Sequence, residues 1–125
     1  MNALVNEWVS KAEEDWRSAN VLLGHDSPLV TPALFHMQQC AEKLLKALLI
    51  KKKIDFERRH DLSYLLGLAD APNVQSHARL LNELNPFAVE IRYPGDLPQF
   101  SILEASAMLS RLDRFRDSIR PLIME

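Results

Sequence analysis

Residues 33–50 constrain the fold most, because this segment forms a helix with one apolar and one polar side. At about 100° per residue, one side carries small or apolar groups: Met37, Cys40, Ala41, Leu44, Ala47 and Leu48. The other side carries polar groups: His36, Gln38, Gln39, Glu42, Lys43 and Lys46. Phe35, Leu49 and Ile50 also fall on the polar side, where a surface helix would expose them to water. We therefore expect this side to meet a partner.

Apolar residues recur every three or four positions through most of the chain, which is the helical period. The spacing predicts five helices, over residues 5–23, 31–52, 61–71, 73–91 and 101–122. Gly24 is expected to end the first helix, and Thr31 to cap the second. Asp61 is a natural cap for the short third helix. The prediction is a single all-α domain over residues 1–125, a compact antiparallel bundle with a four-helix up-and-down core plus a short helix.

Prolines and a capping motif mark the remaining boundaries. Pro72 is expected to end the third helix, and Pro86 should kink or break the fourth, because proline removes a backbone donor. Residues 93–98 contain two prolines and a glycine and are expected to form a loop. Ser101 and Glu104 have the Ser-x-x-Glu spacing of a capping box at the start of the last helix.

Composition limits the function classes. The 125-residue chain is 47% apolar and 26% charged, as expected for a soluble globular domain. Its net charge of −2 argues against a protein that coats DNA or RNA, since such domains carry a positive excess. No apolar run approaches the roughly 20 residues of a membrane span, and the first residues do not resemble a signal peptide. We expect a cytoplasmic protein in which the single Cys40 is a buried thiol.

Neither a metal site nor a phosphate loop is expected. The four histidines never stand three or four residues apart, and a second cysteine is missing, so no spacing supports zinc. Three separated glycines cannot form a Gly-rich phosphate loop. We therefore predict no cofactor, and a bound nucleotide would have to be held by side chains.

A stripe along the second helix could supply those side chains. It consists of His36, Gln39, Lys43 and Lys46, spaced by three, four and three residues. These groups suit a polyphosphate or an RNA backbone, a helix of a second copy, or plain solvent. Phe35, Leu49 and Ile50 favour a dimer interface, because burying each would contribute roughly 1.5–3 kcal/mol. Across a symmetric dimer, Lys43 or Lys46 would face Glu42 of the second copy.

Residues 35–47, FHMQQCAEKLLKA, resemble the signature helix of HEPN domains, which typically read F-H-x-Q-Q-A-x-E-K-x-L-K-A. Cys40 replaces the usual Ala and keeps a small apolar group. Further matches follow in order: Ala12, Asp15, Ala19, Leu22, Leu23, then His60-Asp61-Leu62 with Leu65, then Arg92-Tyr93-Pro94. The resemblance implies a small, often dimeric helical bundle associated with nucleotides, with minimal nucleotidyltransferases and, in some branches, with RNA cleavage.

We expect any anionic ligand where the signature helix meets the Arg92-Tyr93 motif. Lys43, Lys46 and Arg92 would contact its phosphates, and Tyr93 and His60 would stack or hydrogen-bond. Structural alternatives exist: Arg92 can bond to the last carbonyls of its helix, and His60 beside Asp61 can position a turn or act as a general base. The basic residues of 51–53 and 58–60 form either a solvated loop or a ligand patch.

The Arg-x4–6-His motif of HEPN ribonucleases is absent, since seven residues separate Arg17 from His25 and no other arginine has a histidine in range. We therefore assign no catalytic residue. The leading hypothesis is a non-catalytic module that binds a nucleotide or a phosphate ligand, or is the accessory subunit of a separately encoded nucleotidyltransferase in a toxin–antitoxin-like pair. The alternatives are a metal-independent ribonuclease toxin with a divergent site at Arg92 and His60, and a purely structural dimerisation module.

Overall fold

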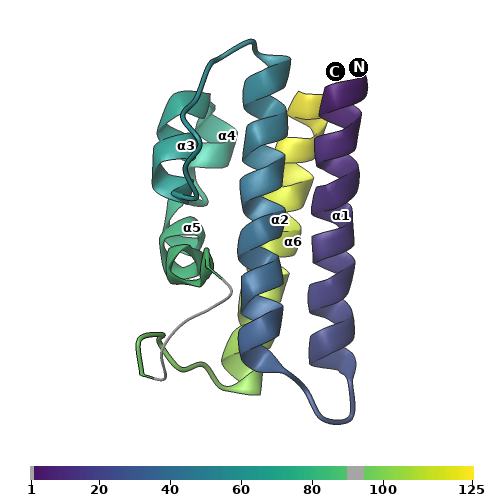
Figure 1. Cartoon of the computed structure of the whole chain (residues 1–125), viewed down its shortest axis with the longest axis vertical. Coiled ribbons are helices and arrows are strands. Elements are labelled where there is room, and N and C mark those ends of the chain that lie inside the picture. Colours follow the sequence, from purple (N-terminus) through teal and green to yellow (C-terminus); the bar gives the residue numbers. More distant parts are fainter. Residues whose placement is uncertain (1, 90–94) are drawn as a thin grey trace.

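Three long helices run side by side along the long axis of the molecule, and shorter helices cover one side of them (Figure 1). The structure, a computed structural model, describes residues 2–89 and 95–125. The long helices are α1 (Ala3–Gly24), α2 (Val30–Lys51) and α6 (Ile102–Met124). The short ones are α3 (Leu62–Ala69), α4 (Pro72–Gln75), α5 (Ala78–Leu84) and the 3-10 helix η1 (Asn85–Phe87). The described residues form no strand, so the all-α prediction is confirmed.

The first two helices form an antiparallel hairpin whose ends differ in detail from the prediction. The side chain of Asn2 caps α1 by accepting a hydrogen bond from the Val5 N–H at 2.8 Å. Gly24 is the last residue of α1, and it does not adopt the left-handed conformation expected of a terminating glycine. The prediction that Thr31 caps α2 is wrong, because α2 begins at Val30. The Leu29 N–H donates a hydrogen bond to the Leu22 carbonyl across the hairpin, directly before the first residue of α2.

The short helices begin and end at residues with local capping or turn geometry. Asp61 caps α3 and accepts hydrogen bonds from the N–H groups of Ser63 and Tyr64, as predicted. Pro72 does not end α3, which already stops at Ala69, before a left-handed Asp70. Instead Pro72 is the first residue of α4, a position where its missing N–H costs nothing.

The helix predicted over residues 73–91 is divided into α4, α5 and η1 within the described part of the chain. The break predicted at Pro86 is confirmed, because α5 ends at Leu84 and Pro86 lies in η1. The capping box of α6 is also confirmed. Ser101 accepts from the Glu104 N–H at 3.0 Å, and the Glu104 carboxylate accepts from the Ser101 N–H at 2.9 Å.

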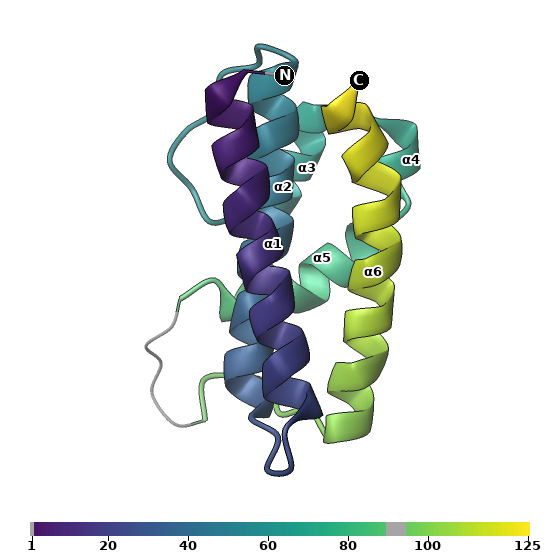
Figure 2. The ribbon, with the colours of Figure 1, turned by 90° about the vertical axis from the view of Figure 1, so that its right-hand side faces the viewer.

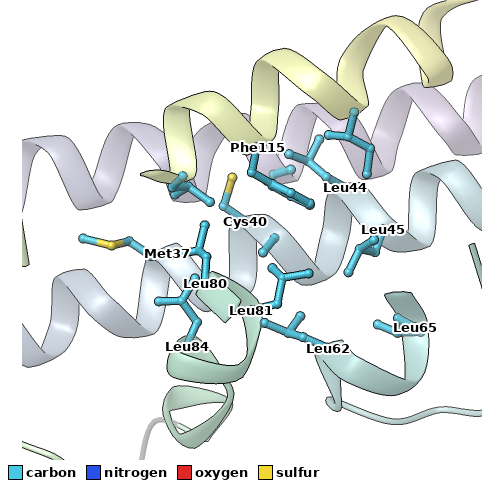
Figure 3. Close-up of a cluster of buried hydrophobic side chains, with 14 of the residues drawn as sticks. Met37, Cys40, Leu44, Leu45, Leu62, Leu65, Leu80, Leu81, Leu84 and Phe115 are labelled. Atoms are coloured by element: carbon cyan, nitrogen blue, oxygen red, sulfur yellow. The ribbon is translucent and has the colours of Figure 1, made fainter. Parts of the chain in front are cut away.

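The core surrounds α2, which packs against α1, α3, α5 and α6. Figure 3 shows Met37, Cys40 and Leu44 of α2 near Phe115 of α6, with leucines of α3 and α5 below them. Both sides of α2 are therefore covered by other helices of the same chain. Leu49 is completely buried within the chain, so no apolar surface of Leu49 is left for a second copy.

None of the described helices has both the length and the apolar character needed to cross a membrane.

Candidate functional site

The polar residues of α2 belong to two separate networks, and the first joins α2 to α1. Asp15 of α1 lies at the seam between the two helices and is almost buried. Its Oδ1 is 2.8 Å from His36 Nδ1, and its Oδ2 accepts a hydrogen bond from Lys43 Nζ at 2.5 Å. One carboxylate therefore fixes both the imidazole and the ammonium group, which are about two helical turns apart on α2.

The second network is centred on Glu42. Its carboxylate accepts hydrogen bonds from Lys46 Nζ at 3.0 Å and Gln38 Nε2 at 3.1 Å, and it lies 3.0 Å from His60 Nδ1. Lys46 Nζ also lies 5.6 Å from the centroid of the Trp8 ring. The side chains of Glu42 and Lys46 are 4% and 8% exposed. The charge of Lys46 is thus balanced inside the protein.

An open groove with a volume of about 750 Å³ follows α1 and α2 beside the first network. Its lining residues are Lys11, Glu14, Asp15, Arg17, Ser18, Val21, Leu22, His36 and Lys43. A smaller hollow of about 220 Å³ adjoins it, is lined by Leu4, Glu7 and Trp8, and shares Lys11 and Lys43 with the groove. Figure 2 shows the pair of helices that carry both, with α1 in front of α2.

The groove presents several groups that suit an anion. Arg17 is exposed and forms no ion pair with the described residues. Lys11 has a solvated partner, Glu14, at 3.3 Å, and such a pair contributes little. His36 uses Nδ1 for Asp15, and its Nε2 has no hydrogen-bond partner among residues 2–89 and 95–125. A guanidinium, two ammonium groups and a ring nitrogen thus line one surface.

Comparison with known proteins decides the family. Residues 5–121 match the family model described as the HEPN domain. The chain belongs to the HEPN family. The crystal structure of an archaeal HEPN homologue has a similar fold, with a TM-score of 0.71, 23% sequence identity, and coverage of 95% of this chain and 97% of that one. A search of curated proteins gave no match.

In this HEPN domain the predicted ligand residues do not converge on one site. His36 and Lys43 share the groove through Asp15, whereas Lys46 and His60 belong to the Glu42 network. The stripe predicted along α2 is therefore divided.

Gln39 connects the two parts, because its Nε2 donates to Gln38 Oε1 at 2.7 Å, and Gln38 in turn donates to Glu42. The predicted contacts from Arg92 and Tyr93 lie outside the described residues.

The predicted dimer residues are also used within the chain. Glu42 is buried in its own network, so facing a lysine of a second copy would cost it three internal contacts. Ile50 is half-buried against the core. Phe35 is half-buried, and its ring meets the His36 ring edge-on at 5.2 Å. The apolar groups that suggested an interface on this side of α2 thus have partners inside one chain.

Sequence reasoning missed the α1 side of the groove. The residues Lys11, Asp15 and Arg17 lie 19 or more positions before the first α2 residue of the groove, so no local motif joins them to α2. One signal was present: Asp15 falls on the apolar stripe of α1, between Ala12 and Ala19, which are both buried. A carboxylate at a buried position requires a hydrogen-bonding or cationic partner, and the nearby helix supplies two.

Other candidate groups of the HEPN domain have structural roles. Cys40 is buried, as predicted, and burial raises the pKa of its thiol far above the usual range. At the end of α2, Lys51 donates to the carbonyls of Ile123 and Glu125, and Lys52 donates to that of Ala69 at 2.6 Å. These lysines tie the bundle together. Residues 2–89 and 95–125 contain no group of three or more metal-ligating side chains.

Proposed function

We propose that this HEPN domain binds a nucleotide in the groove between α1 and α2. The observation that supports this is the pair of adjoining hollows that share Lys11 and Lys43. The larger one also contains the exposed Arg17, and the smaller one contains the half-buried Trp8 ring. A nucleotide has the matching two parts, a phosphate chain and an aromatic base.

The groups in the groove are suited to separate parts of the ligand. Arg17 offers a planar fork that can bind two phosphate oxygens, and Lys43 is held in place by Asp15. His36 Nε2 provides a further hydrogen bond. The Trp8 ring offers a stacking surface, worth about 1–3 kcal/mol per base in nucleic-acid sites. The groove volume of about 750 Å³ lies within the range of small-molecule sites.

Isothermal titration calorimetry with ATP, GTP, UTP and pyrophosphate tests this function. Arg17→Ala should weaken nucleotide binding by about 3- to 10-fold, since it removes one exposed charge-assisted contact. Trp8→Leu should reduce the preference for nucleotides over pyrophosphate. Arg58→Ala, an equally exposed arginine outside the groove, is the matched control. Unchanged nucleotide affinity in an Arg17→Ala/Lys11→Ala variant would rule out the groove.

A ribonuclease is the second candidate, and the Asp15–His36 pair favours it. Asp15 orients the imidazole through Nδ1 and leaves Nε2 at the groove, which is the arrangement of a general base. RNA incubated with the protein in chelator should remain intact if the domain only binds nucleotides. Cleavage that disappears in His36→Ala would instead support the ribonuclease.

Three further roles stay predictions: a homodimer, a nucleotidyltransferase partner and a purely structural dimerisation role. Light scattering of the purified protein measures its mass and tests the homodimer directly. Co-purification with a small nucleotidyltransferase encoded beside it would test the accessory-subunit role. A dimer whose melting temperature does not respond to any nucleotide would favour the structural role.

A further inference from the structure

A second basic hollow lies where α5 meets α6, away from the groove. It has a volume of about 300 Å³ and is lined by Ser76, His77, Arg79, Leu80, Arg111 and Arg114. Figure 1 shows α5 and α1 on opposite sides of α2. Three of the chain's nine arginines thus line one small depression.

The charges of this hollow are not balanced by its own walls. None of its six lining residues is acidic, in contrast to the groove, which contains Glu14 and Asp15. Arg111 is paired with Glu83 at 2.5 Å. Arg79 and Arg114 are exposed, and neither forms an ion pair within residues 2–89 and 95–125. The hollow therefore keeps an excess of positive charge.

The walls are held in place by contacts between the two helices. His77 Nε2 lies 3.0 Å from Ser118 Oγ, and the His77 ring meets Phe115 edge-on at 5.7 Å. The Arg111–Glu83 pair joins α6 to α5 about two helical turns away. Burial and the charge of Arg114 hold the pKa of His77 below its usual range, so His77 is a neutral hydrogen-bonding group at neutral pH.

Arginine side chains bind phosphate oxygens in pairs, and guanidinium groups on two facing helices, Arg79 on α5 and Arg114 on α6, can hold neighbouring phosphoryl groups of one chain. No tryptophan, tyrosine or phenylalanine lines the hollow, and the His77 ring that does is packed edge-on against Phe115. We propose that the hollow between α5 and α6 is a second anion site, which binds a chain of two or more phosphoryl groups through Arg79, Arg111 and Arg114. This site is independent of the nucleotide groove.

Histidine side-chain NMR separates the two sites, because His77 lines the second hollow and His36 lines the groove. Pyrophosphate added to the full chain should shift the His77 ring signals in a saturable way. Arg79→Gln/Arg114→Gln should weaken this response by about 10-fold or more and leave the His36 response unchanged. Both arginines are exposed, so the urea midpoint of this variant should equal that of the wild type.

Arg58→Gln is the matched control and should leave the His77 titration unchanged. ATP and pyrophosphate should bind at His77 with affinities within about 3-fold of each other, because the phosphates alone are recognised. No His77 shift at millimolar pyrophosphate would overturn the proposal, and so would an unchanged affinity in the double variant. A much tighter response to ATP would refute recognition of the phosphate chain alone. If pyrophosphate shifts the His77 signals of the wild type and not the His36 signals, the groove is refuted and the site between α5 and α6 is supported.

Discussion

Neutralising Glu42 should destabilise the protein strongly, because Glu42 balances the charge of a buried lysine. The side chains of Glu42 and Lys46 are only 4% and 8% exposed, and their charged atoms are 3.0 Å apart. Removing one partner of a buried pair typically costs about 3–5 kcal/mol. We expect Glu42→Gln to lower the free energy of unfolding by about 3 kcal/mol, a large part of the roughly 5–15 kcal/mol of a typical domain.

A second substitution, at Lys46, tests whether the unpaired buried charge causes this loss of stability. Lys46→Met in the Glu42→Gln background removes the uncompensated charge and keeps a flexible apolar chain near Trp8. Replacing both members of a buried pair by uncharged groups is often close to neutral. We therefore expect the double variant to be about 2 kcal/mol more stable than Glu42→Gln.

Urea unfolding followed by tryptophan fluorescence measures these differences. With an m-value near 1.5 kcal/mol/M, a loss of about 3 kcal/mol lowers the urea midpoint by about 2 M. Lys11→Met, which breaks the exposed pair with Glu14, is the control and should change stability by less than about 0.5 kcal/mol. A Glu42→Gln variant within about 1 kcal/mol of the wild type, or a double variant no more stable than the single one, would refute the reasoning.

Three further outcomes follow from local contacts. Because burial raises the pKa of the Cys40 thiol, Ellman's reagent should label Cys40 only as fast as the protein unfolds, and immediate labelling of the folded protein would contradict its burial. Asp61→Ala should cost about 1 kcal/mol at pH 7 through loss of the α3 cap. The hydrogen bond from the Tyr64 N–H is the main cause that lowers the pKa of Asp61. The capping stability is therefore complete above the usual value of about 3.8 and should fade as the pH falls through the lower folded-state pKa. An NMR titration should give His77 a pKa below 6.5, and Arg114→Ala should raise it; an unchanged value would show that the charge of Arg114 does not reach the ring.

Helix caps and helix breaks that depend on neighbouring residues could be predicted from the sequence. Asp61 and the Ser101–Glu104 pair cap their helices through hydrogen bonds that span three residues or fewer, so spacing alone identifies them. Pro86 breaks its helix for a reason that is equally local. Pro72 shows the limit, because the same residue can follow one helix or begin the next, and only the left-handed Asp70 decides between them.

The candidate site depended on contacts that a helical projection does not contain. Projecting residues 33–50 shows two sides, but it cannot show that four other helices surround α2. Leu49 was therefore predicted to anchor a dimer, although it packs inside the chain. Likewise, Lys43 and Lys46 look equivalent on the projection. Asp15 of α1 holds the first at the groove, and Glu42 holds the second in the interior.

The enclosure of α2 separates the residues that maintain this fold from most of the residues proposed to bind a ligand. Almost every position of α2 faces another helix, so most substitutions there should lower the free energy of unfolding whatever the protein binds. The exposed residues Arg17, Arg79 and Arg114 stand on α1, α5 and α6 and support little of the core. A chain could exchange these for other side chains without disturbing α2. The signature helix therefore identifies the scaffold, and a search for differences in ligand among such domains belongs on the outer faces of the helices around it.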